Sequence, residues 1–599
     1  MLSYRKLAMR VLGRPLHTGG IDSPRPASQR AAAFILTAVM LTTLAAPAFA
    51  GTWSIENGDI TVKAGETGND VTQNNVTTKN DTDTIITNSD KDTASSHTVT
   101  IETNDKNDKV EVTLDNVNIK ADSGSALTSK GDVTLTLKGD NSLTGGNGGS
   151  GISSSGSLTI SGGENNSLTA QGGSGSGIFS SGGVTISGGT VNATGGSSSG
   201  GSDSGDGIHS GSLTISGGTV TATGGSGADG SGGSGIRTFS SGGGTISGGT
   251  VNATGGTGGT GENSNGGSGI YIYSSSGSLT VSGGTVTANG GSGGGNGGDG
   301  ISSTNTTISG GSTVTANGGN GGSLVGGDGI RSGGGLTVSD GTVTAKGGNG
   351  DSKDGYGGDG IRSGGVVTIS GNTVNAAGGY GGKVGGYGIC SFDRVAISGG
   401  TVEAAGGNGS TGGGSGIYSS VIDLSGSLEL TAKAGSPNGK ALSQNGSELV
   451  LDTIKDKLGP GAKVTATDAD GKVIDQVSTP RPVEPEESSS SSDGGSSAPS
   501  APASPLPGLT VTDKDGQRIS YTSTQSGNTL TVCVGRLTAS FRISLAALRQ
   551  LRAEGIETIA FQTVLCSTTL SVDELLAMGG EDAEAVLTHR FTDSSLTVG

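Results

Sequence analysis

The stretch Gly207–Gly225, GIHSGSLTISGGTVTATGG, contains the repeating phrase of this 599-residue chain. It opens with Gly-Ile, continues through an apolar-Thr-apolar segment and a Ser-Gly-Gly turn to Thr-Val-x-Ala, and runs into a glycine-rich loop. Copies spaced 26 to 34 residues apart begin with Gly-Ile at Gly151, Gly177, Gly207, Gly235, Gly269, Gly300, Gly329, Gly360, Gly388 and Gly416. A period of this length indicates a solenoid, in which each unit buries its apolar face only against its neighbours.

Each copy holds three short runs of alternating apolar and polar residues, separated by glycines, and each run is typical of a strand. We therefore predict an all-β fold, a right-handed parallel β-helix with three short strands per coil and coils stacked roughly 4.8 Å apart. Glycine should supply the positive φ angles of the corners, and the glycine-rich loops should absorb length changes at little entropic cost. The residues expected to point inward are Ile208, Leu213, Ile215, Val220 and Ala222.

The N-terminus has the pattern of an exported protein. Six basic residues precede the apolar run 31–46, and Ala48-Phe49-Ala50 fits an A-x-A cleavage site, so residues 1–50 are predicted to be a signal peptide. A retained N-terminal membrane anchor is the alternative, and no later segment is apolar enough to span a bilayer. Removal of 1–50 changes the net charge from −17 to 29 − 51 = −22, which disfavours nucleic acid and anionic polymers as partners.

The rest of the chain divides by composition. Residues 51–145 are predicted to be irregular first coils that cap the β-helix, 146–420 its regular repeats and 421–478 its closing coils. Residues 479–507 consist mainly of Pro, Ser and Glu and are predicted to be a disordered linker. Residues 508–599 are predicted to form a small α+β domain, with Ser544 as the N-cap of one helix and Ser571 with Glu574 as a capping box for another.

Few residues in the repeats have the chemistry of catalysis. Glycoside hydrolysis needs paired carboxylates, whereas the acidic residues of the regular coils are mostly isolated, so we predict that the chain is not an enzyme. Polysaccharide lyase or hydrolase activity remains a minor alternative. Cys533 and Cys566 are predicted either to form a disulfide or to be two reduced thiols, and the sequence does not decide between them.

Acidic residues recur directly before Gly-Ile in four copies, at Asp206, Asp299, Asp328 and Asp359. The last three should stack close together, and carboxylates with loop carbonyls would suit calcium. The other interpretation is turn chemistry, because Asp-Gly is a favoured turn dipeptide.

The residue directly after Gly-Ile, here named the X position, should face solvent. Planar side chains suited to stacking on sugar rings gather there and form our candidate carbohydrate-binding ladder: Phe179, His209, Arg237, Tyr271, Arg331, Arg362 and Tyr418. Solvated side chains that keep a strand surface soluble are the alternative. A second outward ladder of Thr-x-Thr pairs is similar to the flat arrays of ice-binding β-helices, but Asn192, Asn252, Asn375 and Glu403 interrupt it.

The combination of Asp-Gly-Ile, Leu-Thr-Ile-Ser-Gly-Gly-Thr-Val and Asn-rich N-terminal coils resembles exported bacterial carbohydrate-binding β-helix proteins of the clostridial cellulose- and pectin-binding type. The resemblance covers residues 51–450 and implies a non-catalytic, calcium-containing polysaccharide binder, with Asp206, Asp299, Asp328 and Asp359 as its acidic sites. We therefore expect a secreted or cell-surface glycan-binding protein. The alternative is a structural or adhesive solenoid that binds a protein.

Overall fold

The computed structural model describes residues 51–103, 108–480, 509–512, 518–519, 521–534, 539–563, 567–578, 583–589 and 594–598. It divides the chain into two compact units, 1–484 and 485–599. The predicted signal peptide and the predicted linker, apart from residues 479–480, lie outside the described residues. No helix among the residues described is long and apolar enough to cross a membrane.

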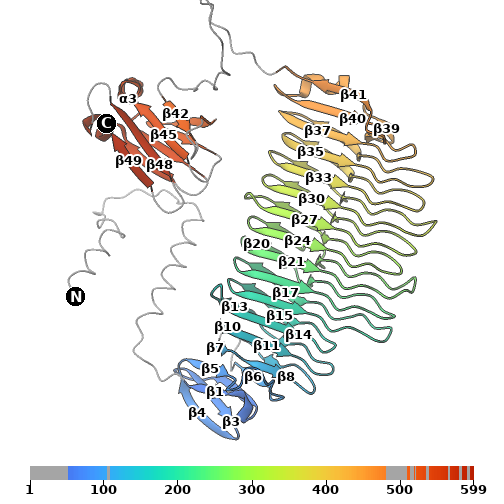
Figure 1. The fold of residues 1–599 in the computed structure, drawn as a ribbon, viewed down its shortest axis with the longest axis vertical. Coiled ribbons are helices and arrows are strands. Elements are labelled where there is room, and N and C mark those ends of the chain that lie inside the picture. Colours follow the sequence, from blue (N-terminus) through green and yellow to red (C-terminus); the bar gives the residue numbers. More distant parts are fainter. Residues whose placement is uncertain are drawn as a thin grey trace, which may run out of the picture. The chain divides into compact units, whose positions relative to one another are not determined.

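The first unit is a parallel β-helix of about 16 turns, as predicted (Figure 1). Three strands per coil form three columns, each strand pairing in parallel with its counterpart in the next coil. The Gly-Ile column consists of β2 (Ile60–Ala64), β6 (Val99–Glu102), β9 (Leu127–Ser129), β12 (Ile152–Ser154), the first parts of β15 (Ile178–Ile186) and β17 (Ile208–Ile215), β19 (Ile236–Thr238), β22 (Ile270–Ile272), β25 (Ile301–Ser303), β28 (Ile330–Ser332), β31 (Ile361–Ser363), the first parts of β34 (Ile389–Ile397) and β36 (Ile417–Leu424), and β38 (Leu442–Gln444).

The apolar-Thr-apolar segments form the second column, which joins the first because four long strands run through both. Its members are β1 (Thr52–Ser54), β5 (Thr84–Thr87), β7 (Lys109–Asp115), β10 (Asp132–Lys138), β13 (Leu158–Gly162), the second parts of β15 and β17, β20 (Gly244–Ile246), β23 (Ser278–Val281), β26 (Asn305–Ile308), β29 (Leu336–Val338), β32 (Val367–Ile369), and the second parts of β34 and β36.

The Thr-Val-x-Ala segments form a separate 14-stranded sheet. It contains β8 (Asn118–Lys120), β11 (Asp140–Thr144), β14 (Ser167–Gln171), β16 (Thr190–Thr194), β18 (Thr219–Thr223), β21 (Thr250–Thr254), β24 (Thr285–Asn289), β27 (Thr313–Asn317), β30 (Thr342–Lys346), β33 (Thr373–Ala377), β35 (Gly400–Ala405), β37 (Leu428–Lys433), β40 (Lys463–Thr467) and the antiparallel β41 (Val473–Ser478).

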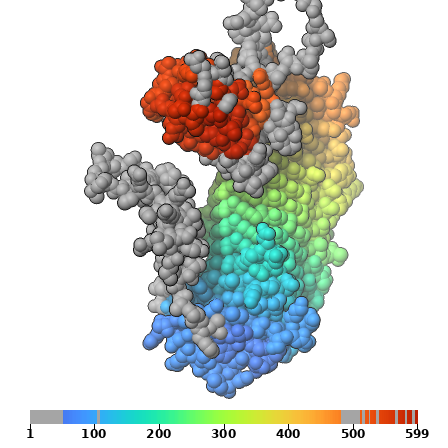
Figure 2. Space-filling view, turned by 60° about the vertical axis from the view of Figure 1, so that its left-hand side comes forward, coloured from blue at the N-terminus to red at the C-terminus, as the bar shows by residue number. Residues whose placement is uncertain are grey.

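Apolar residues from all three columns meet inside each coil. The five residues of the Gly207 copy that were predicted to point inward are at most 2% exposed, and their counterparts continue this core from coil to coil. At the N-terminal end the chain adds η1 (Ile55–Asn57) and the antiparallel strands β3 (Asn69–Gln73) and β4 (Val76–Asp81). At the other end β39 (Ser447–Glu448), η2 (Leu451–Lys457) and β41 follow the last parallel strands. In Figure 2 the coils succeed one another as bands of colour, from blue to orange.

Glycine has two different tasks in this unit. At the Ser-Gly-Gly turns the second glycine has a positive φ, 79° at both Gly218 and Gly249, as predicted. In the glycine-rich loops the glycines allow two backbone arms to pack directly on each other. The Gly358 amide donates to Gly348 O at 2.8 Å, and Gly379 donates to Gly358 O at 2.8 Å, so the hydrogen bonds alternate between the outgoing and returning arms.

The loops vary in length from copy to copy, yet their backbone arms are closely packed. A Cβ added to Gly348 would lie 1.9 Å from Gly319 O, and one added to Gly358 would lie 2.0 Å from Gly327 O. Neither position has a positive φ. We name these stacked arms the glycine layer; it holds the loops beside the Gly-Ile column in a fixed arrangement.

The described residues of the second unit form two four-stranded sheets and two short helices around their own apolar core. One sheet contains β42 (Leu509–Thr512), β45 (Ala539–Ser544), β48 (Glu584–His589) and β49 (Ser594–Val598). The other contains β43 (Thr522–Ser526), β44 (Thr529–Cys533), β46 (Thr558–Gln562) and β47 (Ser567–Ser571). The predicted N-cap Ser544 is confirmed, because its Oγ accepts from Ala547 N at the start of α3 (Leu545–Ala553). Of the predicted capping box, the serine half is present: Ser571 Oγ accepts from Glu574 N in α4 (Val572–Met578).

Candidate functional site

The X positions stack in register along the Gly-Ile column. Phe179 pairs with His209, His209 with Arg237 and Arg237 with Tyr271; after Ser302, Arg331 pairs with Arg362, and Cys390 leads to Tyr418. The predicted ladder is therefore one continuous column.

The expectation that this column faces open solvent was wrong in part. Most X side chains are half-buried, Arg331 is exposed, and Cys390 is completely buried. The cause is the glycine layer, whose returning arm ends immediately before each Gly-Ile and brings its own side chains beside the X column.

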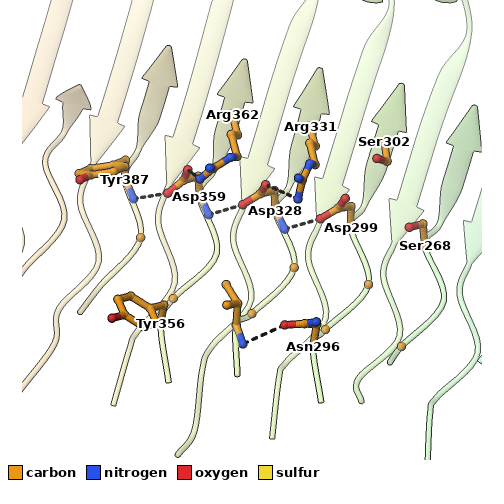
Figure 3. A pocket seen from close by; sticks show the side chains of 18 of the residues that line it. Ser268, Asn296, Asp299, Ser302, Asp328, Arg331, Tyr356, Asp359, Arg362 and Tyr387 are labelled. Carbon is orange, nitrogen blue, oxygen red and sulfur yellow. Dashed lines mark hydrogen bonds and ion pairs between the residues drawn. The ribbon is translucent and has the colours of Figure 1, made fainter. Parts of the chain in front are cut away.

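The aspartates before Gly-Ile form a second ladder parallel to the first (Figure 3). Asp299 Oδ1 accepts from the Asp328 amide at 2.8 Å, and Asp328 Oδ1 accepts from the Asp359 amide at 2.7 Å. Asp359 Oδ1 accepts from the Tyr387 amide at 2.7 Å. Asp206 does the same for Ser234 at 2.6 Å, away from the other three. Each carboxylate thus links its coil to the next.

The second carboxylate oxygen faces the X residue of the same coil. Asp359 Oδ2 lies 3.1 Å from Arg362 Nη1, and Asp328 Oδ2 lies 3.8 Å from Arg331 Nη1. Asp206 Oδ2 lies 3.1 Å from His209 Nδ1. The sequence pattern Asp-Gly-Ile-Arg therefore encodes an ion pair, and Asp-Gly-Ile-His the corresponding carboxylate–imidazole contact, a connection that the sequence analysis did not make.

Stacking the three carboxyls perturbs their protonation. Burial raises the pKa of Asp299, Asp328 and Asp359, while the nearby guanidiniums partly offset this effect. The pKa of Asp328 is raised furthest above its usual range, because the negative charges of Asp299 and Asp359 on either side add to its desolvation. Asp328 is therefore the carboxyl most inclined to hold a proton.

The carboxylates of the aspartate ladder already have partners within the protein. Asp328 and Asp359 use one oxygen for a backbone amide and have the other opposite a guanidinium, and no second acidic residue adjoins either of them in sequence. Among the described residues no group of three or more His, Cys, Asp or Glu side chains could hold a metal ion. Asparagine makes the same coil-to-coil bond, as when Asn349 Oδ1 accepts from the Tyr380 amide at 2.9 Å. These contacts favour the turn interpretation, and calcium binding stays a prediction.

Between the X column and the glycine layer lies a groove of about 740 Å³, which we name the axial groove. Its side chains come from consecutive coils and include Tyr271, Asp299, Ser302, Asp328, Arg331, Tyr356, Asp359, Arg362 and Tyr387. The carboxylates and guanidiniums occupy its middle, while tyrosines lie towards its two ends. Figure 3 shows Tyr356 opposite the row of carboxylates, on the glycine-layer side.

The groove thus brings together part of the predicted site. Tyr271, Arg331, Arg362 and three of the four aspartates line it, whereas the remaining predicted residues do not: Phe179, His209, Arg237, Tyr418 and Asp206. Tyr418 lies beside it, with its ring stacked on that of Tyr387 at 4.8 Å between centroids.

Several aromatic residues of this face were missed by the sequence analysis. Tyr387 occupies the position of the aspartates, directly before Gly-Ile, and burial raises its pKa to about 12, so its phenol keeps its proton at neutral pH. Phe239, Tyr273 and Phe392 follow the X position by two residues, where a strand returns to the same face. This spacing was the signal that could have identified them.

These rings form clusters beyond the groove. Phe179, His209 and Phe239 contact one another, with 5.0 to 6.5 Å between ring centroids. The Arg237 guanidinium carbon lies 5.6 Å from the ring centres of both Tyr271 and Tyr273. The whole Gly-Ile face therefore carries planar side chains, in clusters along the column.

Cys533 Sγ lies 3.2 Å from Gln562 Oε1. Cys566 lies outside the described residues, so the choice between disulfide and thiols stays open.

Comparison with known proteins adds no assignment: no protein-family model, no curated protein and no solved structure matches this chain.

Proposed function

We propose that this chain is an exported, non-catalytic polysaccharide-binding β-helix protein, and that the axial groove is its binding site. The observation that carries the proposal is the make-up of the groove: tyrosine rings towards both ends, with carboxylates and guanidiniums from successive coils between them. Sugar rings stack on flat side chains, and their hydroxyls exchange hydrogen bonds with carboxylates and guanidiniums. Export is inferred from the signal-peptide pattern of residues 1–50.

Catalysis is less well supported by the contacts of the same residues. A glycosidase needs one carboxyl free to donate a proton and another free to attack or to activate water. In Asp328 and Asp359 both oxygens already have protein partners. The polar groups of the groove are held in place by these contacts and can hydrogen-bond to a ligand, which suits binding.

The test is a glycan array, followed by affinity measurements, with the full chain after residue 50. Tyr271→Ala and Tyr387→Ala should each weaken binding of the polysaccharide identified on the array by about tenfold, the loss expected for one stacked ring. Tyr380→Ala is the matched control, because Tyr380 is 48% exposed and does not line the groove. If both groove variants bind as tightly as this control, the binding site lies elsewhere.

The alternative, an adhesive solenoid with a protein partner, would use another surface. Strands β16, β18, β21, β24 and β27 contain no charged residue, although the chain has a net charge of −17. Their outward side chains are mainly threonines in register, such as Thr219, Thr250 and Thr285. Thr250→Glu should abolish a partner interaction on this face and leave glycan binding in the groove unchanged.

A further inference from the structure

Each guanidinium that lines the axial groove faces a carboxylate of the protein itself. Arg331 and Arg362 each face a carboxylate of their own coil, at 3.8 and 3.1 Å. Asp299 has no such partner, because Ser302 occupies its X position. Three carboxyls therefore lie beside two guanidiniums. Even if Asp328 is protonated, the number of negative charges falls only to the number of positive charges. Among the residues that line the groove, no positive charge is left over for an acidic sugar; Arg237 and Lys383 lie outside this lining, against the rings of Tyr271 and Tyr356.

The guanidiniums nevertheless remain available as hydrogen-bond donors. The side chains of Arg331 and Arg362 are 55% and 36% exposed, whereas those of Asp328 and Asp359 are 7% and 5% exposed. An uncharged hydroxyl can accept from the exposed N–H groups while the ion pairs stay intact. A carboxylate in the same place would compete with Asp328 and Asp359 for their partners and would be repelled by Asp299.

The groove also has a defined length and direction. The strands that carry its residues, β22, β25, β28, β31 and β34, are consecutive members of one column. Four inter-strand steps separate the coil of Tyr271 from the coil that Tyr387 begins, a distance of about 19 Å, or roughly four linked sugar rings. A single sugar could reach the rings at one end only.

We propose that the axial groove selects an uncharged, linear polysaccharide, lying along the solenoid axis and bound through a segment of roughly four sugar rings. This inference rests on the proposed function and specifies its ligand. Acidic polymers such as polyuronates are disfavoured because each guanidinium that lines the groove already faces a carboxylate. Recognition of a chain end alone is disfavoured, because the residues that line the groove are distributed over several coils.

The experiment measures affinity of the full chain for neutral linear gluco-, xylo- and manno-oligosaccharides of increasing length, with polygalacturonate as the acidic probe. Affinity for the neutral series that binds should rise with each added sugar and level off near four. Polygalacturonate should bind at least about tenfold more weakly than a neutral polymer. Equal affinity for the acidic polymer, or full affinity already with a disaccharide, would overturn the inference.

A double variant, Asp328→Asn with Asp359→Asn, tests the charge argument. Asparagine Oδ1 can still accept the next coil's amide, as Asn349 does, but both guanidiniums lose their counter-charge. This variant should gain at least about tenfold in affinity for polygalacturonate. Asp206→Asn is the control, since Asp206 also bonds the next coil's amide and faces its own X residue, His209, but lies outside the groove. No gain in the double variant would refute the charge argument, whereas a wild-type chain that binds neither kind of glycan would refute the proposed function itself.

Discussion

Replacing Gly358 with alanine should severely destabilise the β-helix, because this position has no room for a side chain. The new Cβ would lie 2.0 Å from Gly327 O, whereas ordinary contact begins at 3.4 Å. That oxygen belongs to packed backbone and cannot swing away as the end of a side chain could. Overpacking of a core costs about 1–3 kcal/mol. Separating the arms also breaks the bonds of Gly358 to Gly348 and Gly379, at about 1 kcal/mol each. We expect a total loss of about 3–5 kcal/mol in the free energy of unfolding.

The matched control is Gly200→Ala. A Cβ there would meet nothing within 4 Å, and the backbone does not have a positive φ, so the change should be neutral or stabilise by about 0.4–1 kcal/mol. Urea unfolding followed by circular dichroism gives both free energies, and hydrogen exchange of the amides in residues 347–360 locates the damage. If Gly358→Ala unfolds within about 1 kcal/mol of the control, the glycine layer is not close-packed in the way described.

Three further predictions follow from individual contacts. The pKa values of Asp299, Asp328 and Asp359 are raised in the folded state, so the folded state binds protons more tightly than the unfolded state. The stability that these protonated carboxyls contribute is complete below the unfolded pKa of about 3.9. It is lost as the pH rises through their pKa values in the folded state. Urea unfolding across this range should show that decline, and a variant with all three changed to Asn should show a flatter profile; identical profiles would contradict the assignment. If the aspartates serve only the turns, calcium and EDTA should leave the melting temperature of the full chain unchanged, whereas a clear shift would support the predicted calcium binding. Ser544→Ala should destabilise the second unit by about 1 kcal/mol through loss of its N-cap, as measured by urea unfolding, and an unchanged midpoint would show that the cap contributes nothing.

Much of the fold could be predicted because the relevant physics is local. The alternation around Ile208, Leu213 and Val220 predicts short half-buried strands, and its repetition predicts stacking. The caps of the two helices were equally accessible, since a serine before an apolar run identifies its own hydrogen-bond partner. In both cases the interacting groups lie within one repeat or one helical turn.

The candidate site was only half accessible for the opposite reason. The X column and the aspartate column could each be read from the repeat. The pairing of Asp359 with Arg362 also has a fixed three-residue spacing, but the sequence analysis did not connect the two columns. The position of Tyr356 beside them could not be predicted, because it depends on how far a loop of variable length folds back.

The sequence by itself determined the coil, its three strands, the register of the stack and the identity of the inward residues, because a periodic apolar pattern can bury itself in only one way. Tertiary structure alone decided what the glycines of the loops are for and where the groove runs. A glycine in a sequence is compatible both with a flexible backbone and with a closely packed one. Only the position of the neighbouring coil distinguishes the two: a Cβ at Gly358 would lie 2.0 Å from the backbone oxygen of Gly327.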